Sequence, residues 1–211
     1  MSRPAAVAVA DRVHVALASS TALGGQPAAG DEAAGLPPWW ASEHRAVRVL
    51  LRQLLTEVAG PEAGATPIAA LPGGRPFLPE RPDLTVSLSH SGRWMAAAVG
   101  VGPEVGVDVQ VPQPASAALL RRCCRPAALA ALAGMPQRRR DLEFAWIWTA
   151  QEACVKATGA GLAGLPWTIP VEVGQCAGTW QGVRWVSLRD RFSIPLSCAY
   201  RPPAGERAVA P

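Results

Sequence analysis

The sequence predicts an α+β protein in which each half of the chain forms a helix and several antiparallel strands. In the first half, apolar residues recur three and four positions apart over residues 42–58, which is the spacing of an amphipathic helix. Residues 84–90 then alternate between apolar and polar side chains, as a half-buried strand does. The second half repeats this combination, with alternation over 105–110 and a helical stretch over 139–158.

The composition is that of a globular protein with a mild positive charge. Hydrophobic residues make up 49% of the 211 residues, enough for a packed core in one domain or two small ones. The net charge of +4 favours an acidic partner or a phosphate ligand, but the charge is not clustered as in nucleic-acid-binding proteins. The arginine run at 138–140 is typical of a solvated helix start. We therefore expect no nucleic-acid partner.

The cysteines and the apolar runs bear on the compartment. The five cysteines are odd in number and lack metal-site spacing, so we expect reduced thiols in the cytoplasm. The adjacent Cys123 and Cys124 are predicted to be buried core residues. No apolar run approaches the roughly 20 residues that span a bilayer, and the opening AAVAVA stops at Asp11 and Arg12. The protein is expected neither to span a membrane nor to be exported.

Turn and cap signals delimit the elements of the first half. A strand is predicted over residues 12–18, followed by a loop rich in Gly, Ala and Pro that runs to Trp40. Ser42 is the predicted N-cap of the amphipathic helix, which ends at residues 60–61. Three arginines lie off the apolar stripe of this helix: Arg45, Arg48 and Arg52. They form either a solvated basic face or part of a binding site.

Three strands follow, over residues 84–90, 94–100 and 105–110. Successive side chains of a strand point to opposite faces, so Asp108 and Gln110 share one face of the third strand and its valines share the other. Two short helices broken at Pro126 and the long helix over 139–158 come next. Further strands are predicted around Val171, Val183 and Leu196, with Pro195 indicating an edge position for the last.

The long helix carries the only lysine of the sequence, Lys156, four residues after Glu152. This spacing places both side chains on one face, about 6 Å apart. An ordinary surface salt bridge is one interpretation. The helix around the pair is apolar, however, and a partly buried carboxylate and amine favour a functional site.

Asp108 and His90 are the other candidates for chemistry. Asp108 is either a turn cap or, with a second carboxylate from a nearby helix, part of a cluster of oxygen ligands suited to Mg2+. His90 follows Ser89 at the end of a strand, and the pair is either an ordinary turn or a donor set for phosphate oxygens. Two carboxylates, one amine and this turn together indicate a site that handles phosphate.

Four segments in this order resemble the surfactin-type (Sfp-type) 4'-phosphopantetheinyl transferases. They are GRPF, VSLSHSGRW, VGVDV and WTAQEACVKATGAGL, supported by EHRAVRVLLRQLL, and they span about residues 42–170. The resemblance implies two similar α+β lobes related by a pseudo-twofold axis, with the active site in the cleft between them. We expect an N-terminal lobe at 1–103, a C-terminal lobe at 104–200 and a flexible tail at 201–211.

The resemblance also implies an activity. Such an enzyme moves the phosphopantetheine arm of coenzyme A onto a serine of an acyl or peptidyl carrier protein, with Mg2+ bound, and releases adenosine 3',5'-bisphosphate. Polyketide or nonribosomal peptide biosynthesis is the expected setting, and one chain is expected to suffice as a monomer. The open alternative is a catalytically impaired relative that binds coenzyme A or a carrier domain without transfer.

The resemblance assigns roles to particular residues. Asp108 and Glu152 would bind Mg2+. Gln110 is the third expected metal residue: it stands where many members have an acidic ligand, and its neutral amide would coordinate the ion or hold a water, with weaker binding. Lys156 would contact the coenzyme A phosphates or help to deprotonate the acceptor serine. Gln151 stands where the family usually has a basic residue. The residues expected to hold the nucleotide are Arg45, Arg75, Ser89 and His90, and those expected to steer an acidic carrier are Arg121, Arg122 and Arg125.

Overall fold

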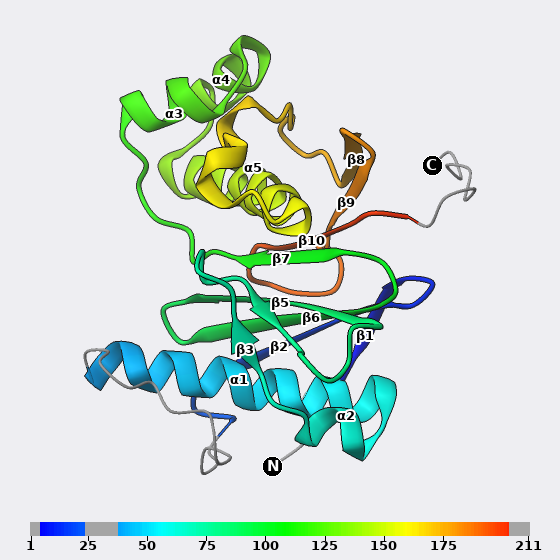
Figure 1. Ribbon diagram of the computed structural model, residues 1–211. Helices are drawn as coiled ribbons and strands as arrows, with labels where there is room; N and C mark the ends of the chain where they lie inside the picture. The colour runs from blue at the N-terminus through cyan, green and yellow to red at the C-terminus, as the bar shows by residue number, and fades with distance from the viewer. Residues whose placement is uncertain (1–4, 24–37, 203–211) are drawn as a thin grey trace.

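The computed structural model describes residues 5–23 and 38–202, which form four layers (Figure 1). Helix α1 (Pro38–Ala59) covers the outer side of one antiparallel sheet, and helix α5 (Gln137–Thr158) covers the outer side of a second. The two sheets face each other between the helices. The predicted α+β class is thus confirmed, while the pseudo-twofold relation of two lobes stays a prediction.

The first sheet has the strand order β1-β2-β6-β5, and every neighbouring pair is antiparallel. The strands are β1 (Val7–Ala10), β2 (Val13–Ser19), β5 (Leu84–Ser91) and β6 (Trp94–Val101). Between α1 and β5 lie the short helix α2 (Pro61–Ala65) and a small hairpin of β3 (Ala69–Ala70) and β4 (Pro76–Phe77). This hairpin carries Arg75 toward the edge strand β5.

The second sheet has the order β7-β10-β9-β8, again antiparallel throughout. Its strands are β7 (Val105–Val109), β8 (Ala177–Trp180), β9 (Val183–Ser187) and β10 (Leu196–Tyr200). Helices α3 (Ala117–Cys123) and α4 (Pro126–Ala133) precede α5, and two 3-10 turns, η1 (Gly161–Gly164) and η2 (Pro166–Thr168), follow it. Both β5 and β7 are edge strands, and they lie side by side.

Three apolar layers hold these elements together. Leucines of α1 pack on one face of the first sheet, and α5 packs on the outer face of the second. Between the sheets lie small and β-branched residues, among them Val15, Ala98 and Val107. Each strand contributes side chains to the two layers on either side of its sheet, because side chains i and i+2 share one face and side chain i+1 points to the other.

Several predicted elements need correction. Helix α1 begins at Pro38 rather than at Ser42, and β1, α2 and the β3–β4 hairpin were not predicted. Val171 lies outside any strand, whereas β8 was missed. The edge position inferred from Pro195 is wrong, because β10 pairs on both sides. Pro195 comes just before the strand, where a missing N–H removes no ladder bond.

Two arginines of α1 are also not a solvated face. Arg48 is 8% exposed and donates to the carbonyl of Ile68, while Arg52 donates to the carbonyls of Gly64 and Thr66. The two side chains therefore hold α2 and the segment after it against α1. Of the predicted tail, residues 203–211 lie outside the described residues, as do residues 24–37 of the predicted loop.

The chain crosses from the first sheet to the second between Val101 and Val105, beside the expected boundary between residues 103 and 104. The division into two domains itself stays a prediction. No helix in the described ranges 5–23 and 38–202 is both long enough and apolar enough to cross a bilayer.

Candidate active site

Asp108 is the penultimate residue of β7 and faces α5, because the valines on either side of it point into the layer between the sheets. The residue is only 6% exposed. Its Oδ1 atom accepts hydrogen bonds from Ser89 Oγ and from Lys156 Nζ, each at 2.7 Å. The turn-cap interpretation is wrong, since this carboxylate is held from two other elements.

Gly106 explains how the helix comes close enough to reach this carboxylate. A Cβ atom on Gly106 would lie 2.1 Å from the carbonyl oxygen of Ala153 and 2.4 Å from the backbone nitrogen of Ala157. The backbone of α5 therefore rests directly on β7, which only a residue without a side chain permits. The glycine of the VGVD segment brings Lys156 within reach of Asp108.

Lys156 is ion-paired with Asp108 rather than with the glutamate one helical turn earlier. Its Nζ atom also donates to the carbonyl oxygen of Val107 at 3.1 Å and to that of Leu88 at 3.4 Å. The three acceptors belong to the two edge strands β5 and β7. An ammonium group has three hydrogens on one atom, so it can meet acceptors that converge on one point.

Glu152 stands one turn earlier on α5 and is half-buried. Its Oε1 atom is buried and has no hydrogen-bond partner among the described residues. Burial raises the pKa of Glu152, and the neighbouring Asp108 carboxylate raises it further, while Lys156 lowers it. A buried carboxylate oxygen without a donor, beside a second carboxylate, is the chemistry of a position that receives a cation.

A pocket of about 310 Å³ opens beside this group. Glu152, Lys156 and Ser87 line it from α5 and β5, and Arg75 lines it from the β3–β4 turn. Arg75 packs against Gly159, whose φ of 72° ends α5 in the left-handed conformation; a Cβ there would meet the guanidinium. The pocket thus combines two cations with the backbone of glycines at 73–74, 159 and 161, which suits a phosphate-bearing ligand.

The other residues expected at the nucleotide lie elsewhere. His90 points to the α1 side of the sheet, where its Nδ1 atom lies 3.4 Å from Glu43 Oε2. Ser89 points to the opposite side, as adjacent strand residues must, and bonds to Asp108. Neither His90 nor Arg45 lines the pocket of Lys156. Their nucleotide roles stay predictions.

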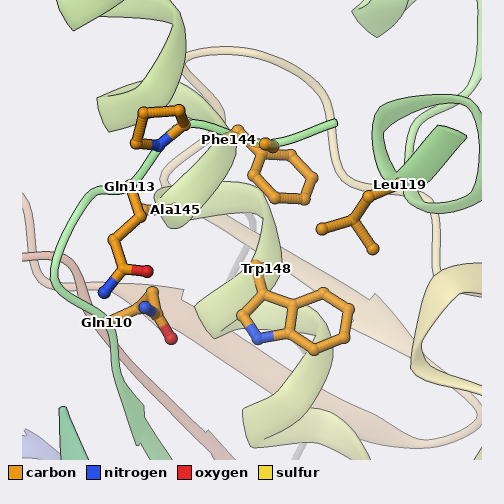
Figure 2. Close-up of a pocket in the computed structure, with 8 residues that line it drawn as sticks. Gln110, Gln113, Leu119, Phe144, Ala145 and Trp148 are labelled. Carbon is orange, nitrogen blue, oxygen red and sulfur yellow. The ribbon is translucent and has the colours of Figure 1, made fainter. Parts of the chain in front are cut away.

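A second pocket lies farther along the same face of β7 (Figure 2). Gln110 and Gln113 line one side, and Phe144, Trp148 and Leu119 line the other. The Nε2 atom of Gln110 donates to the carbonyl of its neighbour Val111 at 2.9 Å. Gln110 is thus placed in this apolar pocket rather than in the pocket of Lys156, and its role as a metal ligand stays a prediction.

The two pockets follow one seam between α5 and β7. Ala145, Trp148, Glu152 and Lys156 are spaced three or four apart and share one face of α5. They run past β7 from the Gln110 end to the Gly106 end. The carboxylates therefore stand between an apolar pocket and a cationic one.

Gln151 is a structural residue. It is fully buried, and its Nε2 atom donates to the carbonyl oxygens of Cys123 at 2.8 Å and Ile169 at 2.9 Å. These bonds tie the end of α3 and the end of η2 to α5. Gln151 does not line the pocket of Lys156.

The sequence predicted three residues that the structure brings together, Asp108, Glu152 and Lys156, with Arg75 beside them. Other parts of the site were not foreseen. The acceptors on Leu88 and Val107 are backbone carbonyls, which every residue has, so the sequence alone does not identify them. Ser87 did carry a signal, since it repeats at every second position with Ser89 and Ser91. Within residues 5–23 and 38–202, no group of three or more His, Cys, Asp or Glu side chains is arranged to hold a metal.

Comparison with known proteins finds similarity to one superfamily. Residues 104–201 match the model of the 4'-phosphopantetheinyl transferase superfamily, and this segment holds Asp108, Glu152 and Lys156. The chain is similar to that superfamily over this segment, and the resemblance inferred from the motifs is confirmed.

Curated relatives carry the same description. A 4'-phosphopantetheinyl transferase of Bacillus subtilis is 32% identical over 122 residues, which are 55% of this chain and 54% of that protein. The transferase HetI of a Nostoc species is 32% identical over 144 residues, 64% of this chain and 61% of HetI. The transferase Sfp of Bacillus subtilis strain 168 is 29% identical over 90 residues, 43% and 40% of the two chains. The chain thus aligns with roughly half the length of these relatives.

Proposed function

We propose that this chain is a 4'-phosphopantetheinyl transferase that moves the phosphopantetheine arm of coenzyme A onto a serine of an apo acyl or peptidyl carrier protein. The serine hydroxyl loses its proton with help from Lys156, and its oxygen attacks the phosphorus next to the pantetheine arm. Adenosine 3',5'-bisphosphate leaves with the electron pair of the broken P–O bond. The observation that carries the proposal is the meeting of Asp108, Glu152 and Lys156 at a pocket that also contains Arg75.

Asp108 and Glu152 are the proposed ligands of Mg2+. Both are acidic oxygen donors, and the unpartnered, buried Oε1 of Glu152 fits a cation. A magnesium ion bound there would neutralise charge on the diphosphate of coenzyme A. Oδ1 of Asp108 is already occupied by Ser89 and Lys156, so Oδ2 is the oxygen that remains for the ion.

Lys156 and Arg75 are the proposed partners of the diphosphate. Both line the cationic pocket, and phosphoryl transfer needs fixed positive charge and in-line placement more than covalent help from the protein. Arg45 and His90 are proposed to contact the outer phosphate and the ribose of the nucleotide. The nucleotide would therefore have to reach α1 and the end of β5.

The acceptor is proposed to approach along the other end of the seam. The apolar pocket in Figure 2 and the cationic pocket lie on opposite sides of the two carboxylates. The donor phosphates and the acceptor would therefore meet at Asp108 and Glu152. Arg121, Arg122 and Arg125 are exposed on or beside α3, next to Leu119 of that pocket. Charges there suit a carrier that is acidic near its serine.

The finer expectations belong to the same proposal. Two lobes at 1–103 and 104–200 would form the cleft, and a monomer in the cytoplasm would serve polyketide or nonribosomal peptide biosynthesis. The cytoplasmic setting is proposed from the odd number of cysteines and their lack of metal-site spacing.

The test is transfer itself. Purified protein is incubated with coenzyme A, Mg2+ and several apo carrier proteins, and each carrier is weighed by mass spectrometry. The expected result is a gain of one phosphopantetheine group, lost when Mg2+ is chelated and in D108N and E152Q. The matched control is E104Q, which removes an exposed carboxylate paired with Arg201 and should retain transfer.

Two outcomes would contradict the proposal. Wild-type protein that leaves every carrier unmodified refutes transfer, and calorimetry with coenzyme A then shows whether the chain is a binding protein only. Full transfer by D108N and E152Q would mean that the reaction occurs elsewhere in the chain.

A further inference from the structure

Three serines of β5 join the two sheets where their edge strands meet. Ser87, Ser89 and Ser91 stand at every second position, so their hydroxyls project from the same side of β5. Each accepts a hydrogen bond from a backbone N–H next to it, from Val107 at 3.0 Å, Val109 at 3.3 Å and Val111 at 2.9 Å. Side chains thus replace the backbone ladder between β5 and β7, and we call these residues the serine ladder.

The three hydroxyls differ in what they do with their own hydrogen. A serine hydroxyl has one hydrogen to donate and two lone pairs to accept with. Ser89 donates to Asp108 Oδ1 at 2.7 Å. Neither Ser87 nor Ser91 donates to a protein acceptor within the described ranges.

This difference decides which serine is able to bind phosphate. Phosphate oxygens of coenzyme A are acceptors, so a serine needs a free O–H to bind one. Ser89 has none while it holds Asp108. Ser87 has one, and it lines the pocket that contains Lys156 and Arg75.

We propose that the serine ladder divides its work: Ser89 is a positioning residue that holds the Asp108 carboxylate, and Ser87 is the serine that donates to a phosphate oxygen of the ligand. This inference rests on the proposed function, and it revises the expected nucleotide role of Ser89. With Ser89 and Lys156 both on Oδ1, the carboxylate is fixed from two sides. Ser91 lies in neither pocket and acts in the ladder only.

The ladder supplies its own matched controls, because S87A, S89A and S91A each remove one hydroxyl that accepts from a β7 or adjoining N–H. Each variant is measured for Mg2+ affinity by calorimetry, for KM toward coenzyme A and for kcat. S89A should weaken Mg2+ binding and kcat by about 10- to 100-fold, the usual effect of losing a group that orients a metal ligand. S89T, which keeps the hydroxyl, should recover most of the loss.

S87A should weaken coenzyme A binding rather than Mg2+ binding. We expect its KM for coenzyme A to rise about tenfold, as for loss of a hydrogen bond to a charged group, with Mg2+ affinity unchanged. S91A should retain wild-type kinetics and lose only thermal stability. Equal kinetic effects in all three variants, or a raised KM with normal Mg2+ binding in S89A, would overturn the inference.

Failure of the inference is separable from failure of the proposed function. If the wild type transfers nothing, crystal structures of metal-free S89A and S87A still decide the role of Ser89. The Asp108 carboxylate should rotate in S89A and stay in place in S87A, and an unmoved carboxylate in S89A contradicts positioning. Calorimetry with coenzyme A alone likewise decides Ser87, since unaltered affinity in S87A contradicts its role.

Discussion

At the scale of single residues, the geometry around Nζ accounts for the one lysine in a sequence otherwise supplied with arginine. The acceptors on Asp108, Val107 and Leu88 converge on a single nitrogen. A guanidinium spreads its donors over a planar fork and needs more room, so it cannot meet three convergent acceptors in the space that an ammonium fills. The resemblance implied phosphate contact or proton transfer for this lysine, and the three convergent acceptors add a requirement for a compact charge.

Replacing Lys156 by arginine tests the geometric reason. K156R keeps the charge but should leave at least one of the three acceptors unpaired, which lowers the free energy of unfolding by about 1–3 kcal/mol and abolishes transfer. Urea unfolding and the carrier assay measure both effects. The control is R81K in the exposed pair of Arg81 with Asp83, which should change little. Wild-type stability and transfer in K156R would refute the account.

Glu152 gives a prediction about pH in metal-free protein. Burial, and next the Asp108 charge, raise its pKa above the ordinary 4.5, so the folded protein holds this proton more tightly than the unfolded chain does. The resulting stabilisation is complete below the unfolded pKa and is lost as pH rises through the raised folded pKa. E152Q does not ionise, so it escapes this loss.

In EDTA, E152Q should therefore become more stable relative to the wild type as pH rises above 4.5, until the difference levels off above the raised pKa. Urea unfolding of both proteins across this range measures the difference. If the free energy of unfolding of E152Q instead fell relative to that of the wild type as pH rises, the direction of the shift would be contradicted.

At the scale of elements, the site depends on how closely α5 lies on β7. Gly106 sets that distance, and Thr149 of α5 is linked to Ser197 of β10 by a hydrogen bond of 2.8 Å. Helix and sheet are thus fastened at two neighbouring strands. Displacing α5 would move Glu152 and Lys156 together away from Asp108.

Adding one methyl group at Gly106 should separate them. G106A places a Cβ against backbone atoms of α5, which cannot rotate away as a side chain can, and we expect a loss of about 3 kcal/mol in the free energy of unfolding. The control is G134A, where the nearest atom to a new Cβ is 3.7 Å away and φ is −77°. This change should be neutral or slightly stabilising. Equal stability of the two variants would show that α5 has room to move.

The comparison of sequence and structure is also clearest at this scale. Long periodic segments were predictable, as were the residues at fixed places on them, because alternation alone puts Asp108 opposite the valines of β7. Elements of two to five residues, such as β3, β4 and α2, are too short to show a period. The joining of β5 to β7 through serine hydroxyls was not predictable, since it depends on how two sheets meet. The same alternation could have separated Ser89 from His90, which the motif had placed together.

At the scale of the whole molecule, four layers leave the cysteines in two interior regions. Cys123, Cys124 and Cys154 belong to the apolar cluster around α5, the first two at the end of α3, and Cys198 lies in the layer between the sheets. Burial raises the pKa of Cys123 to about 11 and those of Cys124, Cys154 and Cys198 to about 12. Cys176 alone is exposed.

Alkylation should therefore report on the integrity of these layers. Only the thiolate reacts, and buried thiols are both protonated and screened from reagent, so native protein near neutral pH should take up one iodoacetamide adduct, at Cys176. C176S should take up none until denaturant is added, and then four adducts should appear together as the layers open in one transition. Mass spectrometry at increasing urea counts the adducts. Labelling of Cys198 before Cys154 would mean that the sheets part while α5 remains packed, and that the seam holding Asp108 to Lys156 is more stable than the contact between the sheets.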